Sequence, residues 1–235
     1  MWGSMSRKPG QPADYLGEIY KKVLLEQRIF PSGVERYPEA AADRVWEAII
    51  KKLFQKDYKF DAGFYGSLNE YAKKVAYFFH ASLQGTACYP GADLALRAVT
   101  DAGLTQGLCA DGQCFTVVQL RRGLDALGGG VRLDDVMTND LRLLSSDVRG
   151  RKPSERLFRQ ALDVLEAKGI GPEEVLHVGS RIDKDIVPAK KLGVKTALFA
   201  GDRASLAATT EQLKDPASKP SVLLTDLGQI ADVIG

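Results

Sequence analysis

After residue 89 the sequence alternates short apolar runs with longer stretches in which apolar residues recur at helical spacing. Short apolar runs are typical of strands buried on both faces, and their alternation with helices predicts a parallel α/β sheet. The expected strands are 105–110, 131–138, 175–179, 195–199 and 222–224, and the expected helices are 92–102, 115–127, 154–168, 186–191 and 204–213. We therefore expect residues 89–235 to form an α/β core domain.

The first third of the chain has a different pattern, with helical spacing of apolar residues and no strand-like run. This spacing occurs three times between residues 15 and 83, and Pro and Gly separate the three stretches. Residues 15–88 are therefore predicted to form a small helical domain. Residues 1–14 contain Pro and Gly among mostly polar neighbours, which predicts a flexible arm.

The charge balance argues against nucleic acid or a membrane as a partner. Lys and Arg number 32 and Asp and Glu number 30, so the net charge is only +2. No apolar run approaches the roughly 18 to 20 residues of a membrane span. The three cysteines form no Cys-x-x-Cys pair, which suits a reducing compartment. We expect a cytoplasmic protein.

One candidate for chemistry is Lys152, which precedes Pro153 at the start of an expected helix. Proline is preorganised for the first helical turn and keeps the preceding residue extended. An ammonium placed there would neutralise phosphoryl oxygens held over the carboxyl ends of the strands. The simpler alternative is an ordinary surface lysine.

A second candidate follows the expected strand 175–179, which ends in a glycine. Asp183 and Asp185 come shortly after it, in a loop at the carboxyl end of a parallel strand. Carboxylates there are hard oxygen ligands of the kind that Mg²⁺ uses together with a substrate phosphate. The alternative is that one of them caps the next helix.

Together these segments resemble the haloacid dehalogenase superfamily, which includes many phosphatases and phosphoglycolate-phosphatase-like enzymes. The matching residues are Lys152-Pro153 with Phe158 and Ala161-Leu162, then 172–180 with Asp185, followed by Ala189-Lys190, Leu192-Gly193-Val194 and Thr196-Ala197. The resemblance implies a Rossmann-like parallel core with a helical cap domain, and residues 15–88 would be that cap.

The resemblance also implies roles for individual residues. Lys152 matches the lysine that stabilises the reacting carboxylate and the phosphoryl charge. Asp185 matches the acidic Mg²⁺ ligand, and Asp183 is a neighbour in the same role. Ser180 stands where many members have another aspartate, and we expect Ser180 and Asp111 to contact the ligand.

Two departures from the family pattern concern the phosphoryl-transfer machinery. Ala110 occupies the position of a Ser or Thr that would donate a hydrogen bond to the phosphoryl group, and alanine cannot donate one. The strand ending in Asp-x-Asp, which carries the nucleophile, is absent, and only Asp14 precedes the cap. That strand lies at the centre of the family's sheet. We expect the gap to be closed by direct pairing of its neighbours, or by a strand from a partner or another copy of the chain.

These features predict a hydrolase-like protein that is impaired or inactive in phosphoryl transfer and binds a small phosphorylated molecule through Lys152 and Asp185. The alternative is an active Mg²⁺-dependent phosphatase whose carboxylate comes from Asp14, Asp111 or a partner strand. Dehalogenation also needs an aspartate nucleophile and is disfavoured for the same reason.

Overall fold

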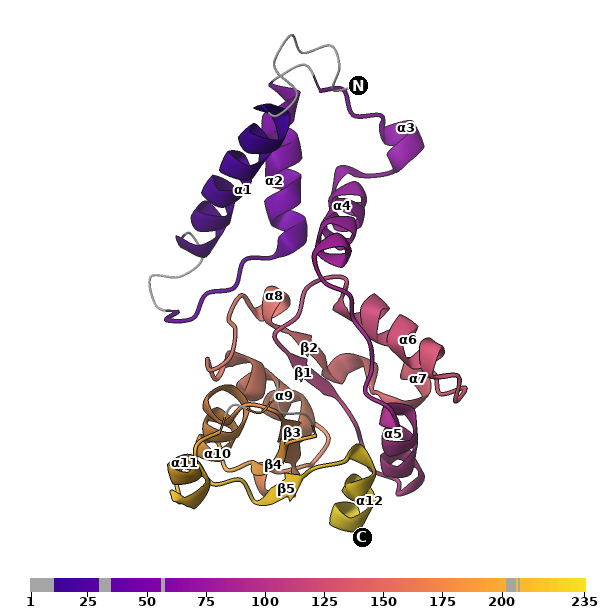
Figure 1. Ribbon diagram of the computed structural model, residues 1–235, viewed down its shortest axis with the longest axis vertical. Coiled ribbons are helices and arrows are strands. Elements are labelled where there is room, and N and C mark those ends of the chain that lie inside the picture. Colours follow the sequence, from indigo (N-terminus) through magenta and orange to yellow (C-terminus); the bar gives the residue numbers. More distant parts are fainter. Residues whose placement is uncertain (1–10, 30–34, 56–57, 202–205, 207) are drawn as a thin grey trace. The chain divides into compact units, whose positions relative to one another are not determined.

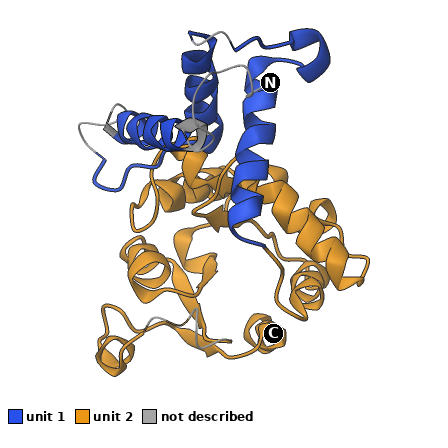
Figure 2. Ribbon diagram, turned by 45° about the horizontal axis from the view of Figure 1, so that its top comes forward, with its two compact units in different colours: residues 1–85 blue, residues 86–235 orange. Residues whose placement is uncertain are grey.

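The computed structural model describes residues 11–29, 35–55, 58–201, 206 and 208–235. Its internal contacts divide the chain into two compact units, residues 1–85 and 86–235 (Figure 2). The first unit is helical and the second is α/β. No helix in the described ranges has the length and apolar character needed to cross a membrane.

The helical unit contains α1 (Gln11–Ile29), α2 (Ala42–Phe54), α3 (Ala62–Tyr65) and α4 (Leu68–Leu83). The three long helices confirm the periodicity of the sequence. α2 packs against α4, where the fully buried Ala72 and Ala76 allow close approach. The flexible arm was wrong for residues 11–14, which form the first turn of α1. Proline suits a first helical turn, and so does the acidic Asp14, which complements the helix dipole.

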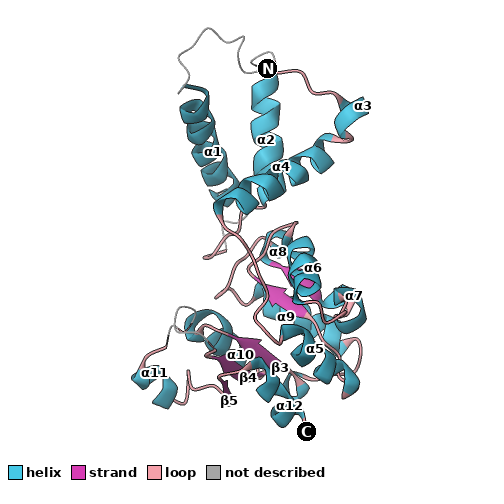
Figure 3. Cartoon of the chain, turned by 45° about the vertical axis from the view of Figure 1, so that its right-hand side comes forward, coloured by secondary structure: helices cyan, strands magenta, loops and turns pink. Residues whose placement is uncertain are grey.

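Over its described residues, the α/β unit contains five strands and the helices between them (Figure 3). In chain order these are α5 (Ala92–Asp101), β1 (Leu108–Ala110), α6 (Thr116–Leu127), α7 (Leu133–Val136), η2 (Asn139–Leu141), β2 (Arg142–Leu144), α8 (Ser145–Val148), α9 (Arg156–Glu166), η3 (Pro172–Glu174), β3 (Leu176–Gly179), η4 (Ile182–Ile186), α10 (Val187–Lys191), β4 (Lys195–Phe199), α11 (Thr210–Lys214), β5 (Val222–Leu224), η5 (Leu227–Gln229) and α12 (Ile230–Ile234).

The strands form two parallel sheets, β1–β2 and β3–β4–β5. Cys109 pairs with Leu143 in the first sheet, and His177 pairs with Thr196 in the second. Figure 1 shows β1 and β3 as the neighbouring strands of the two sheets. Among the described residues no ladder joins β1 to β3, so the expected direct pairing of these strands was wrong. In the part of the chain that the structure describes, the two sheets are therefore separate.

The predicted strand 131–138 was also wrong. Leu133–Val136 is the short helix α7, and the strand that pairs with β1 is Arg142–Leu144. The two buried apolar residues of α7 are three positions apart, which is a helical spacing. Asp134 and Asp135 lie in its first turn, where acidic side chains favour a helix.

Helices cover both faces of the β-strands. On one face, α9 buries Phe158 against Ala189 and Val194, with Cys109 of β1 and Val175 packed against this cluster. A separate cluster joins α5, α12 and strands β3, β4 and β5, and contains Ala95, Ala197, Phe199, Leu224 and Ile230 with Val99 and Leu176 packed against it.

Candidate active site

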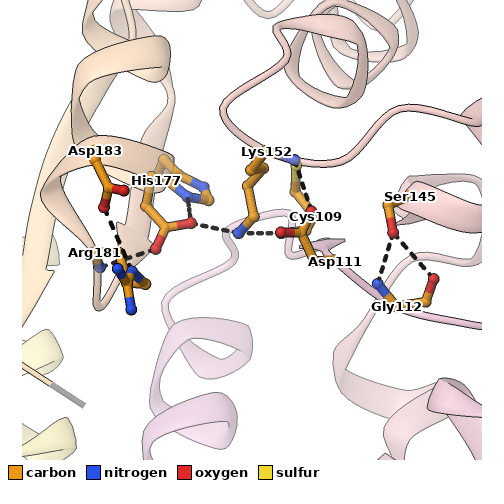
Figure 4. Close-up of polar contacts among 9 residues, drawn as sticks. Cys109, Asp111, Gly112, Ser145, Lys152, His177, Arg181 and Asp183 are labelled. Atoms are coloured by element: carbon orange, nitrogen blue, oxygen red, sulfur yellow. Dashed lines mark hydrogen bonds and ion pairs between the residues drawn. The ribbon is translucent and has the colours of Figure 1, made fainter. Parts of the chain in front are cut away.

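Lys152 lies in the loop before α9, which begins at Arg156, two residues later than expected. Its backbone N–H donates to Oδ1 of Asp111 at 2.8 Å, directly after β1. Its ammonium donates to the carbonyl oxygen of Cys109 at 3.4 Å and forms an ion pair with Asp185 (Figure 4). Only 12% of the Lys152 side chain is exposed. The ammonium is therefore held between the end of β1 and the loop that follows β3.

Asp185 lies in η4, a π-helical turn, and its side chain is 6% exposed. Its Oδ2 accepts the backbone N–H of Arg181 at 3.0 Å, while Oδ1 faces Lys152. The Nε2 atom of His177 is 3.6 Å from Oδ1, which is too long for a hydrogen bond but close enough for an electrostatic contact. Both oxygens of Asp185 are thus engaged.

Gly179, the last residue of β3, leaves the space that Asp185 occupies. A Cβ at position 179 would lie 2.3 Å from Cβ of Asp185, far inside van der Waals contact. The strand therefore has to end in glycine for Asp185 to reach Lys152.

The pKa of Asp185 reflects these contacts. Burial by itself raises the pKa of the carboxyl, because it penalises the charged form. His177 and the ammonium of Lys152 outweigh burial and hold the pKa of Asp185 well below its usual range. Asp185 is therefore an anion at neutral pH, as its ion pair with Lys152 requires.

β1 ends in the alanine that was expected from the sequence. Ala110 is its last residue, so no side-chain hydroxyl is presented there. Burial raises the pKa of the Cys109 thiol to about 11, which agrees with a buried thiol and not a nucleophile. The following loop is fixed instead by Ser145, whose hydroxyl accepts the N–H of Gly112 at 3.0 Å and donates to its carbonyl at 3.2 Å.

The structure brings together three of the residues selected from the sequence, namely Lys152, Asp185 and Asp111. Asp183 is directed elsewhere, because its Oδ1 lies 3.4 Å from Nε of Arg181 and its side chain is 54% exposed. Ser180 directly follows β3 but makes none of the contacts described above.

From the sequence alone, neither His177 nor the backbone N–H of Arg181 could be recognised as a partner of Asp185. The position of His177, two residues before the end of a strand, was the only signal available for the first. No residue pattern identifies a backbone donor such as the second.

The side chains do not fit a magnesium site by themselves. No group of three His, Cys, Asp or Glu side chains within the described ranges could hold a metal ion. Lys152, His177 and Arg181 surround the oxygens of Asp185, and Asp183 faces Arg181. Mg²⁺ usually binds one or two carboxylates together with a substrate phosphate, so it remains a prediction for a site to which another oxygen ligand is supplied.

Comparison with known proteins agrees with the fold. The HAD-hydrolase-like family model matches residues 149–230, which include Lys152 and Asp185. Residues 149–230 of this protein belong to the haloacid dehalogenase (HAD)-like superfamily. A glyceraldehyde 3-phosphate phosphatase of Pyrococcus furiosus is 30% identical over 147 residues, which are 62% of this chain and 53% of that protein. A phosphoserine phosphatase of Thermus thermophilus is 30% identical over 165 residues, 70% of this chain and 58% of that protein.

The structural neighbours of this HAD-like protein support the fold. A 2-haloacid dehalogenase of Pseudomonas syringae pv. Tomato superposes with a TM-score of 0.60 and 18% identity, covering 97% of this chain and 82% of the other. A HAD phosphatase of Thermococcus onnurineus gives a TM-score of 0.51 and 17% identity, covering 94% and 88%. The HAD-like chain spans about half the length of the curated relatives it matches.

Proposed function

We propose that this HAD-like protein is phosphatase-like and binds a small phosphorylated molecule at Lys152, but does not transfer the phosphoryl group by itself. The observation that supports this proposal is that the carboxylates of the site already bind groups of the protein. Both oxygens of Asp185 are engaged, and Asp111 is hydrogen-bonded to the backbone N–H of Lys152. A nucleophile must instead approach the reacting phosphorus to about 3 to 3.5 Å.

The charges around Lys152 also limit phosphate binding. The ammonium of Lys152 is already paired with Asp185, and Asp111 accepts the backbone N–H of the same residue, so an approaching phosphate dianion meets little uncompensated positive charge. A unit charge about 4 Å away contributes about 1 kcal/mol even at the dielectric constant of water. We expect the wild-type chain to bind orthophosphate weakly, with Asp185 opposing the phosphate charge.

Replacing Asp185 by Asn tests this reasoning through the affinity for orthophosphate. Asp185→Asn removes one negative charge and releases the ammonium of Lys152, so the affinity for orthophosphate should rise about fivefold, the equivalent of about 1 kcal/mol. The measurement is calorimetric titration of orthophosphate into the folded variant, with folding checked by circular dichroism. Asp183→Asn is the matched control, because its exposed carboxylate faces Arg181, and it should change the affinity less than twofold.

The alternative function is an active Mg²⁺-dependent phosphatase with Asp111 as the nucleophile. The position of Asp111, directly after β1 and bonded to Lys152, favours this alternative over Asp14, which belongs to the other unit. Release of phosphate from p-nitrophenyl phosphate with and without Mg²⁺ separates the two functions. Turnover by the wild type that both Asp111→Asn and Asp185→Asn abolish would establish the alternative and overturn our proposal.

A further inference from the structure

Arg181 carries a guanidinium whose donors are mostly unpaired. The side chain is 45% exposed, and its Nε lies 3.4 Å from Oδ1 of Asp183. That contact is long, and Asp183 is itself 54% exposed, so the two form an ion pair of the weak surface kind. The two terminal nitrogens of the guanidinium form no hydrogen bond with the described residues. Most of the donors of Arg181 are therefore available to a ligand.

The backbone of Arg181 is fixed close to the ammonium of Lys152. Its N–H donates to Oδ2 of Asp185 at 3.0 Å, while Oδ1 of the same carboxylate pairs with Lys152 (Figure 4). Two nitrogens that bind one carboxylate are at most about 8 Å apart. Arg181 is extended, with φ −126° and ψ 124°, immediately before the turn η4. The base of the arginine side chain is therefore within the length of one small molecule from the ammonium.

The charges at the site favour a ligand that contacts both cations. A single phosphate group gains little from Lys152, because the ammonium is paired with Asp185 and the backbone N–H is bonded to Asp111. A second anionic group on the same ligand can bind the guanidinium of Arg181. The guanidinium fork donates to two oxygens of a carboxylate or phosphate at once. Such a ligand is attracted by two cations where orthophosphate meets one.

We propose that the ligand of this site carries two anionic groups joined by a short linker. A phosphate group faces Lys152, and the second group binds the guanidinium of Arg181. The second group is a carboxylate or another phosphate, because both offer paired oxygens to the fork. The linker is short, because the two anchoring nitrogens are at most about 8 Å apart. Arg181 is then a specificity-determining residue, and this inference rests on the proposed function because it needs a phosphate group at Lys152.

The proposal also gives Asp183 a definite effect. Its carboxylate lies against Nε of Arg181 and leaves the terminal nitrogens free to bind. Its negative charge opposes a second anion at the guanidinium. Removing this charge should therefore strengthen the binding of a ligand with two anionic groups, and should have little effect on orthophosphate, which does not reach Arg181.

Calorimetric titration of the full chain with three ligands tests the proposal. Orthophosphate has one anionic group, whereas 3-phosphonopropionate and 1,2-ethylenediphosphonate have two. The tighter of the last two identifies the second group as a carboxylate or a phosphate. We expect Arg181→Gln to lower the affinity for that ligand about fivefold and the affinity for orthophosphate less than twofold. Asp183→Asn should raise the affinity for the same two-anion ligand about twofold.

Arg151→Gln is the matched control, because it removes the same charge from an exposed arginine next to Lys152 in the chain. It should change each affinity less than twofold, and circular dichroism checks that all variants are folded. Equal losses with Arg151→Gln and Arg181→Gln would overturn the proposal, because the effect would then come from net charge alone.

The failure of this proposal can be distinguished from failure of the proposed function by Lys152→Met. If orthophosphate binds the wild type and Lys152→Met abolishes that binding, the proposed function is supported. Unchanged two-anion affinities in Arg181→Gln would then overturn the second anion site alone. If none of the three ligands binds in a way that depends on Lys152, both the proposed function and this inference are overturned.

Discussion

The ion pair between Lys152 and Asp185 should behave as a strongly coupled unit in unfolding experiments. The two side chains are 12% and 6% exposed, so removing either one leaves a charge that is poorly hydrated. Breaking a buried pair in this way costs roughly 3 to 5 kcal/mol. Both side chains keep some exposure to water, so we expect the lower end of this range, about 3 kcal/mol, for Lys152→Met and for Asp185→Asn.

The double variant should lose much less free energy of unfolding than the two single variants lose in sum. Without the ammonium, Asn at position 185 faces no unpaired charge and can still accept the N–H of Arg181. We therefore expect a coupling energy of about 2 kcal/mol, in the upper part of the range for residues in direct contact.

The two units can be followed separately during unfolding by urea. Both tryptophans, Trp2 and Trp46, belong to the helical unit, so tryptophan fluorescence reports on that unit. Far-ultraviolet circular dichroism records both units, and the part of the transition not seen by fluorescence belongs to the α/β unit. Lys152→Met, Asp185→Asn and the double variant should shift only the part of the urea transition that belongs to the α/β unit. If the effects of Lys152→Met and Asp185→Asn add within about 0.5 kcal/mol, the ion pair does not exist in solution.

Three further predictions concern the same site. Gly179→Ala should destabilise the α/β unit in urea titrations, because its Cβ would lie 2.3 Å from Cβ of Asp185, and a wild-type midpoint would contradict this packing. The lowered pKa of Asp185 contributes stability above its unfolded pKa of about 3.9, and this contribution is lost as the pH falls through the folded pKa. The difference in the free energy of unfolding between wild type and Asp185→Asn should therefore shrink from pH 7 to pH 3. The Cys109 thiol, with its pKa raised to about 11, should react with iodoacetamide at pH 8 roughly 100-fold more slowly than in the unfolded chain, as peptide mapping by mass spectrometry would show.

The sequence predicted the strands of the three-stranded sheet well. Strands β3, β4 and β5 are short apolar runs bounded by Gly or Pro, and these signals are local. β2 could not be found, because it has only three residues and begins with Arg142. The helical spacing of Leu133 and Val136 was mistaken for a strand because the run is short and apolar at both ends.

The site was only partly predictable for a physical reason. Lys152 and Asp185 stand in segments with a recognisable pattern, so the resemblance could assign them. The hydrogen bond between Asp111 and the backbone of Lys152 joins residues 41 positions apart. The direction of Asp183 depends on the π-helical turn of η4, which turns one carboxylate inward and the other outward. Neither feature leaves a periodic signal in the sequence.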